Sequence, residues 1–241
     1  MGARVTEKGD CLSDVELGGA GPFHAVIFDM DGVLVDTEDY YLRERRAFLA
    51  QEGVSVEESE LVTMVGASAA QDLASMMRWF SDAGRPVTED DINELEAAWW
   101  RGHDVDYAAL LNPGVTDTLE RLKARGVRLA LASSSRMVNI LEVLGACGIA
   151  DAFEVITSGE QFAESKPNPE IYLHSLEQLG LDATQCCCVE DSVPGIAAGK
   201  AAGLTVIAKR EERFGFSQDA ADVIVDDIPG VLDIVLPARE G

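Results

Sequence analysis

The chain has 241 residues, with 43 Asp or Glu against 19 Lys or Arg, which gives a formal net charge of −24 at pH 7. So acidic a chain is a poor partner for nucleic acids and anionic membranes, which are bound by basic surfaces. Apolar runs long enough to span a membrane and a signal-peptide pattern are both absent from the sequence, so we expect a cytoplasmic protein without membrane contact.

The first structured element follows a polar stretch, 1–21, which is predicted to be a flexible tail. The apolar run 25–29 predicts a buried strand and ends in Asp29. Asp31 follows two residues later, so the two carboxylates would share one side of the backbone. Carboxylates so placed repel each other unless a cation, a proton or a reaction intermediate takes up the charge.

Residues 38–110 contain no convincing strand, and their apolar spacing predicts helices over 38–52, 68–83 and 89–101. Large apolar side chains form stripes on these helices, which we interpret as the core of a small bundle rather than a cofactor site: Met64, Leu73, Met76, Met77, Trp79, Phe80, Trp99 and Trp100. Three arginines on the first helix are interpreted as exposed ion pairs, with substrate contact as the alternative: Arg43, Arg45 and Arg46.

The remainder of the chain alternates between helix and strand. Asn112 is a plausible N-cap, with Pro113 at the first position of the next helix. The pattern predicts helices over 113–125, 137–147, 168–179 and 193–202, and strands over 127–132, 153–157, 186–190, 204–208 and 222–226. Such alternation implies a parallel sheet covered by helices on both faces. The consecutive cysteines of the fourth strand are interpreted as small buried residues: Cys186, Cys187 and Cys188.

Polar residues follow four of these strands, and the carboxyl ends of parallel strands meet at one edge of a sheet. The residues brought together are Asp29 and Asp31 after the first strand, Ser133 after the second, Lys166 after the third, and Glu190 and Asp191 at the end of the fourth. Lys166 is the only basic residue between Arg136 and Lys200. Dense carboxylates favour a hard divalent cation, and Mg²⁺ suits a site whose shell a phosphate completes.

These parts favour phosphoryl transfer. A carboxylate can attack phosphorus and form an acyl phosphate, while a second carboxylate at the spacing of Asp31 protonates the leaving oxygen and then deprotonates water. Lys166 would hold phosphate oxygens. Two alternatives stay open, because Asp31 could serve only as a metal ligand and Ser133 could serve as the N-cap of the following helix.

The sequence resembles the haloacid dehalogenase-like superfamily, in the branch of beta-phosphoglucomutase and sugar-phosphate phosphatases. Four motifs carry the resemblance: Asp29-Met30-Asp31-Gly32-Val33, Ser133 after a strand, Lys166-Pro167-Asn168-Pro169, and Glu190-Asp191-Ser192 followed by Pro194-Gly195. It implies an α/β fold, a Rossmann-like doubly wound parallel sheet with an inserted α-helical cap. The expected domains are a catalytic core over 22–37 and 111–241 and a cap over 38–110.

The resemblance also implies roles for single residues. It implies that Asp29 is the nucleophile and Asp31 the general acid and base. Phosphate is predicted to contact Ser133, Ser134 and Lys166. Mg²⁺ is predicted to be held by Asp29, Asp31, Glu190 and Asp191.

The leading hypothesis is a monomeric, Mg²⁺-dependent phosphatase that acts on a small phosphorylated metabolite. The alternative is a hexose-phosphate mutase, but such mutases carry a histidine and an arginine where Tyr41 and Ala69 stand here. A third hypothesis, a phosphate-sensing module resembling a response-regulator receiver, does not explain the long helical insertion.

Overall fold

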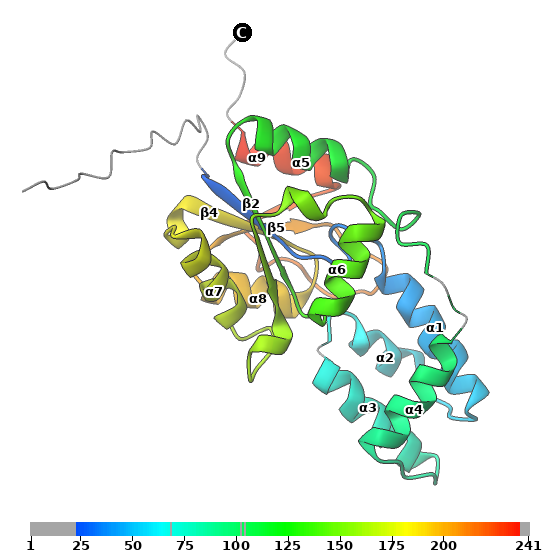
Figure 1. Ribbon diagram of the computed structural model, residues 1–241. Coiled ribbons are helices and arrows are strands. Elements are labelled where there is room, and N and C mark those ends of the chain that lie inside the picture. The colour runs from blue at the N-terminus through cyan, green and yellow to red at the C-terminus, as the bar shows by residue number, and fades with distance from the viewer. Residues whose placement is uncertain (1–22, 68, 102, 104, 237–241) are drawn as a thin grey trace, which may run out of the picture.

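The computed structural model describes residues 23–67, 69–101, 103 and 105–236. In this part of the chain, one six-stranded sheet has the order β3-β2-β1-β4-β5-β6, and every neighbouring pair of strands is parallel. Helices cover both faces, so the predicted doubly wound α/β fold is confirmed (Figure 1). The predicted tail, 1–21, lies outside the described residues.

All six predicted strands are present, with ends that differ from the predicted ones by at most two residues. They are β1 (Ala25–Phe28), β2 (Arg128–Ser133), β3 (Val155–Ser158), β4 (Cys186–Glu190), β5 (Thr205–Lys209) and β6 (Val223–Val225). Their apolar runs are short and bounded by turn residues, which is why sequence alone places them well.

The α-helices span α1 (Glu38–Gln51), α2 (Glu58–Leu61), α3 (Ala69–Asp82), α4 (Glu89–Trp100), α5 (Val115–Ala124), α6 (Met137–Ala146), α7 (Glu170–Leu179), α8 (Val193–Ala201) and α9 (Val231–Val235). Short 3₁₀ helices span Val62–Met64, Ala150–Ala152, Gly159–Gln161, Ala183–Gln185 and Ile228–Gly230. Helices α2 and α9 were not predicted, because they are too short to show a helical period. Among the described residues, no helix combines the length and apolar character needed to cross a bilayer.

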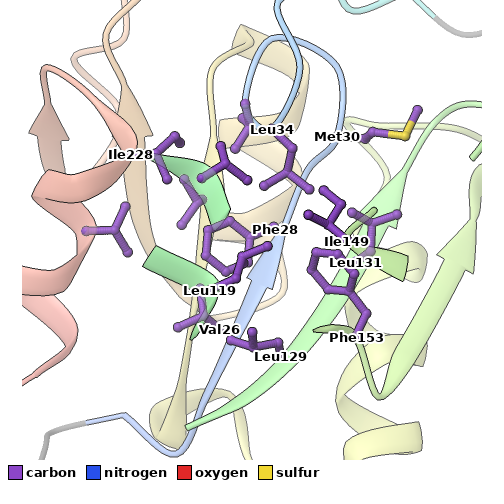
Figure 2. Packing of buried hydrophobic residues seen from close by; sticks show 14 of the residues in the cluster. Val26, Phe28, Met30, Leu34, Leu119, Leu129, Leu131, Ile149, Phe153 and Ile228 are labelled. Atoms are coloured by element: carbon purple, nitrogen blue, oxygen red, sulfur yellow. The ribbon is translucent and has the colours of Figure 1, made fainter. Parts of the chain in front are cut away.

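Alternation along β1 joins the two layers of the core. Val26 and Phe28 pack with α5, α6 and α9 on one face, whereas Ala25 and Ile27 pack with α7 and α8 on the other. Figure 2 shows Phe28 at the centre of the first cluster, among side chains of α5 and β2. Because β1 is fully buried on both faces, the residues that directly follow it are held in place.

The three consecutive cysteines lie in β4 and are fully buried free thiols, which confirms their interpretation as small core residues. Cys187 joins the face that holds Phe28, and Cys186 and Cys188 join the opposite face. Burial raises the pKa of the Cys186 thiol to about 11, which keeps that group protonated and apolar at neutral pH.

Helices α1 to α4 lie together to one side of the sheet (Figure 1). They enclose an apolar cluster of their own, in which Met76 and Phe80 are fully buried. Of the eight large side chains predicted to form this core, all but Trp100 join the cluster; Trp100 lines a cavity instead, with its ring 6.2 Å from that of Tyr41. The separate cluster supports the predicted division, and we propose that residues 38–110 form a cap.

The predicted start of α5 is wrong. The helix begins at Val115 with Gly114 as its N-cap, at a φ of 80°. Asn112 is buried, and its Nδ2 donates to the backbone oxygens of Val33 at 2.8 Å and Gly32 at 3.3 Å. Its side chain therefore stabilises the turn after Asp31 and does not cap a helix. Its partners are far away in the chain, so local sequence does not indicate these hydrogen bonds.

Candidate active site

The candidate site lies where the strand order reverses, between β1 and β4. From this point the sheet is extended by β2 and β3 on one side and by β5 and β6 on the other. The strand connections therefore diverge here and leave a crevice beyond the carboxyl ends of β1 and β4. Asp29 directly follows β1, Glu190 ends β4 and Asp191 follows it. Ser133 ends β2, on the other side of β1. The structure thus brings together the acids and the serine that the sequence placed at this edge.

Lys166 reaches the centre of this group from the loop after β3. Its Nζ lies 2.7 Å from Asp29 Oδ1 and 2.7 Å from Glu190 Oε1, and it donates to the backbone oxygen of Ala132 at 3.0 Å. The side chain is almost fully buried. Lys166, the only lysine or arginine between Arg136 and Lys200, therefore lies next to the proposed nucleophile.

Glu190 is fully buried and is held by several donors. Besides Lys166, the hydroxyl of Tyr172 donates to Oε1 at 2.5 Å, and Ser192 Oγ donates to Oε2 at 3.3 Å. A Cβ on Gly195 would lie 2.0 Å from Oε2, so only glycine fits beside this carboxylate. Tyr172 was not predicted as a site residue, because nothing in the sequence of α7 indicates which strand end its hydroxyl contacts.

Asp31 is fixed by two hydroxyl groups. Thr37 Oγ1 donates to Oδ1 at 2.6 Å, and Ser135 Oγ donates to Oδ2 at 2.9 Å. Both donors were missed as site residues, although Thr37 stands four residues after the first motif and Ser135 ends the serine run that begins at Ser133. The carboxylate of Asp31 is therefore oriented by the protein before any ligand binds.

The serines after β2 form a tight turn at the site. Ser133 Oγ accepts from the backbone N–H of Ser135 at 3.1 Å. The N-cap of α6 is Arg136 and makes no side-chain cap, so the alternative reading of Ser133 as that N-cap is wrong. Ser134 also lines the cavity, and its Oγ accepts from Ser165 at 3.4 Å.

Three of the four predicted metal-ligand carboxylates are close enough to share one cation. Oxygens of Asp29, Glu190 and Asp191 lie within 4.8 Å of one another. Asp191 Oδ2 is buried and has no hydrogen-bond partner among the described residues. A Cβ on Gly32 would lie 1.9 Å from that oxygen, so glycine leaves the space around it open. A hard divalent cation fits this donor set.

Burial dominates the electrostatics of the site. It raises the pKa of Asp29 to about 7, against the lowering effect of Lys166, and it raises the pKa values of Asp31 and Asp191. Burial alone would lower the pKa of Lys166, but the carboxylates of Asp29 and Glu190 hold it above its ordinary value. Such a cluster demands further positive charge beyond one ammonium group.

A cavity of about 800 Å³ extends from these residues to the cap. Its floor includes Asp29, Asp31, Ser133, Lys166 and Asp191, and its roof comes from α1, α3 and α4. The volume lies within the range of small-molecule sites. A phosphate at Asp29 would therefore leave room for an organic group beneath the cap.

The three arginines of α1 differ in their surroundings. Arg46 pairs with Glu58 at 2.6 Å and Arg43 lies 4.0 Å from Asp39, both at the exposed surface, as interpreted from the sequence. Arg45 is only 21% exposed and lines the cavity.

A family profile described as "Haloacid dehalogenase-like hydrolase" matches residues 26–209, most of the chain. The chain belongs to the haloacid dehalogenase-like hydrolase family. Similar proteins include protein CbbY of Rhodobacter capsulatus, with 30% identity over 88% of this chain and 97% of the relative. The "Phosphorylated carbohydrates phosphatase" of Thermotoga maritima shares 33% over 75% and 82%, and hexitol phosphatase B of Escherichia coli K12 shares 32% over 76% and 82%.

Solved structures of this haloacid dehalogenase-like fold agree with the sequence comparison. A predicted phosphoglycolate phosphatase from Haemophilus somnus superposes with a TM-score of 0.75 at 26% identity, covering 90% of this chain and 99% of the other. CbbY from Rhodobacter sphaeroides, in complex with xylulose-(1,5)bisphosphate, superposes with a TM-score of 0.66 at 26% identity, covering 86% and 95%.

Proposed function

We propose that this protein is a Mg²⁺-dependent phosphatase that hydrolyses a small sugar or polyol phosphate through an aspartyl-phosphate at Asp29. The observation that carries the proposal is the buried Asp29 carboxylate, 2.7 Å from the Lys166 ammonium group on the floor of a cavity with room for an organic phosphate. Relatives named as phosphatases of phosphorylated carbohydrates and hexitols support the substrate class.

Each step has a residue to perform it. An Asp29 oxygen attacks phosphorus, and the bond from phosphorus to the leaving oxygen breaks while Asp31 gives that oxygen a proton. Asp31 then takes a proton from water, which attacks phosphorus and releases phosphate and the Asp29 carboxylate. The hydroxyls of Thr37 and Ser135 keep Asp31 in place for both transfers.

The remaining residues bind charge. Lys166 neutralises phosphate oxygens beside Asp29, and Glu190 anchors Lys166 through a 2.7 Å contact. Ser133 and Ser134 line the same end of the cavity and are proposed to hold phosphate as well. Asp29 and Asp191 would bind Mg²⁺. The roles of Asp31 and Glu190 as further Mg²⁺ ligands stay predictions from the sequence. A bound Mg²⁺ would offset the repulsion between nucleophile and phosphate and stabilise charge on the transferred group.

The mutase alternative is less well supported. Tyr41 and Ala69, which stand where the mutases carry a histidine and an arginine, both line the cavity. The Tyr41 hydroxyl lies 3.1 Å from that of Tyr107, and Ala69 offers no charge to hold a second phosphate. Hydrolysis is therefore the reaction that this cavity favours.

The proposal is tested with Asp29→Asn, which keeps the size of the side chain and removes the nucleophile. Hydrolysis of p-nitrophenyl phosphate should fall at least about a thousandfold, with an unchanged circular dichroism spectrum. The exposed Asp39→Asn on α1 is the matched control and should keep full activity. Chelation with EDTA should remove activity, and added Mg²⁺ should restore it.

Retained turnover in Asp29→Asn contradicts the aspartyl-phosphate, and full activity in EDTA contradicts the metal requirement. The covalent step has its own readout, because acid-quenched enzyme should carry a phosphoryl group on the peptide that contains Asp29. Faster interconversion of beta-glucose 1-phosphate and glucose 6-phosphate than phosphate release would favour the mutase instead.

A further inference from the structure

The cap side of the cavity carries an excess of negative charge. Apart from the phosphate-binding floor, the acidic residues that line it are Glu38, Glu44, Asp72, Glu89 and Glu96. Burial raises the pKa of Glu38 to about 8, so the negative charge of this wall comes from the other four. Among the described cap residues of this lining, Arg45 is the only basic one, and outside the cap Arg136 adds one further positive charge. The part of the cavity that would hold the leaving group is therefore acidic overall.

Arg45 is not available to an incoming anion. One terminal nitrogen lies 2.5 Å from Asp72 Oδ2, and the other donates to Glu96 Oε1 and to Met76 Sδ. The two carboxylates come from α3 and α4, so three cap helices meet at this guanidinium. One cation between two anions leaves a net negative charge, and a second anionic group on a substrate would have to displace a carboxylate.

The rest of this wall suits an uncharged polyhydroxylated group. Tyr41, Trp99 and Trp100 line it with aromatic rings that can pack against a carbon skeleton, and Asn93 offers an amide. Carboxylates accept hydrogen bonds from hydroxyl groups but have nothing to donate to a phosphate or a carboxylate. A polyol supplies hydrogen-bond donors for these carboxylates, whereas a second anion brings only more acceptors and more negative charge.

We propose that the cavity selects monophosphates of uncharged polyols over substrates with a second anionic group, and that Asp72 and Glu96 set this selectivity by occupying Arg45. The proposal rests on the proposed phosphatase function and names its substrate class. By this proposal the substrate of this chain carries one phosphate, whereas the solved structure of CbbY holds a sugar bisphosphate. Selectivity here comes from repulsion of the wrong ligand as well as from attraction of the right one.

The test compares two compounds that differ at one carbon, glucitol 6-phosphate and 6-phosphogluconate, as competitors of p-nitrophenyl phosphate hydrolysis in the Mg²⁺-loaded enzyme. The inhibition constant of the polyol should be at least about tenfold lower than that of the acid. In the Asp72→Asn, Glu96→Gln double variant, which frees Arg45, the constant for the acid should fall about fivefold or more and that for the polyol should change little.

Two further variants make the result specific. Adding Arg45→Gln to the double variant should abolish the gain for the acid, since the guanidinium that the double variant frees is then absent. Glu58→Gln removes one negative charge from the exposed partner of Arg46, outside the cavity lining, and should leave the ratio unchanged. Circular dichroism and thermal unfolding show whether each variant is folded.

Three results would each overturn the selectivity. They are equal inhibition constants for the two compounds in the unmodified protein, no competition by either compound, and a shift of the inhibition constants in Glu58→Gln equal to that in the double variant. Failure of the proposed function is distinguishable, because p-nitrophenyl phosphate would then not be hydrolysed at all. Hydrolysis of that reporter without discrimination between the two competitors supports the phosphatase function and refutes the selectivity.

Discussion

At the scale of single residues, the site depends on side chains that hold other side chains. Lys166 is kept beside Asp29 by Glu190, and Glu190 is in turn held by Tyr172. Each of these groups is buried, so each polar atom without a partner would carry a desolvation cost of about 1–3 kcal/mol. The precision of the site therefore depends on the donors around Glu190 as well as on the groups that face the cavity.

The Tyr172→Phe variant tests this dependence. It keeps the ring, whose centroid lies 5.2 Å from Lys166 Nζ, and removes the hydroxyl that donates to Glu190. The free energy of unfolding should fall by about 2 kcal/mol, because a hydrogen bond to a charged group is lost. We expect kcat/KM for p-nitrophenyl phosphate to fall about tenfold, since Glu190 then orients Lys166 less well.

The control for that variant is Tyr40→Phe, a hydroxyl deletion on α1 outside the cavity lining. It should leave kcat/KM unchanged. Urea unfolding and steady-state kinetics measure both effects. If Tyr172→Phe matches Tyr40→Phe in activity and stability, Glu190 does not need the hydroxyl of Tyr172.

Among the secondary-structure elements, the loop before α3 in the cap packs closely against the start of α8 in the sheet domain. Gly66, in the loop before α3, has a φ of 71° and faces Ser192 at the start of α8. Its backbone N–H also donates to Glu38 Oε1 at 3.3 Å. A Cβ at this position would lie 2.9 Å from the Ser192 Cβ. The close contact between this loop and Ser192 therefore depends on glycine at position 66.

Gly66→Ala should hinder closure of the cap. The methyl group would push the loop away from α8, so KM for p-nitrophenyl phosphate should rise about fivefold or more. The left-handed backbone should also cost about 1 kcal/mol of stability. Gly53→Ala is the matched control, because Gly53 has a φ of 72° and nothing within 4 Å of its added Cβ. It should lose similar stability and keep its KM; an equal rise in KM for both variants would refute the closure argument.

At the scale of the whole molecule, the charge of −24 opposes compaction. Exposed ion pairs such as that of Arg46 with Glu58 are worth little individually and do not offset this repulsion. Asp and Glu also outnumber Lys and Arg in the cavity wall. The negative charge of the chain therefore affects which ligands can approach the cavity.

The melting temperature should therefore rise with salt. Raising NaCl from about 0.02 M to about 0.5 M shortens the screening length from roughly 20 Å to about 4 Å and weakens repulsion between surface carboxylates. Differential scanning fluorimetry in the presence of EDTA measures the effect without bound divalent ions. Choline chloride at the same ionic strength should raise the melting temperature equally. A fall in melting temperature would mean that screening of ion pairs outweighs relief of repulsion.

The sequence could predict much of the fold because its signals are local. Apolar runs with turn residues at both ends define β1 to β6, and helical periodicity defines the longer helices. Short elements such as α2 and α9 lack that periodicity, and Asn112 was misread because its partners, Gly32 and Val33, are far away in the chain.

The placement of Asp29, Ser133, Lys166 and Asp191 at one edge of a parallel sheet is predictable from sequence, because strand direction places the residues that follow each strand. The side chains that complete this group became known only from the packing of the folded chain. Tyr172 meets Glu190, and Arg45 lies between Asp72 and Glu96, because helices distant in the chain pack together. Such contacts leave no local pattern in the sequence, since they depend on how whole elements are oriented against one another.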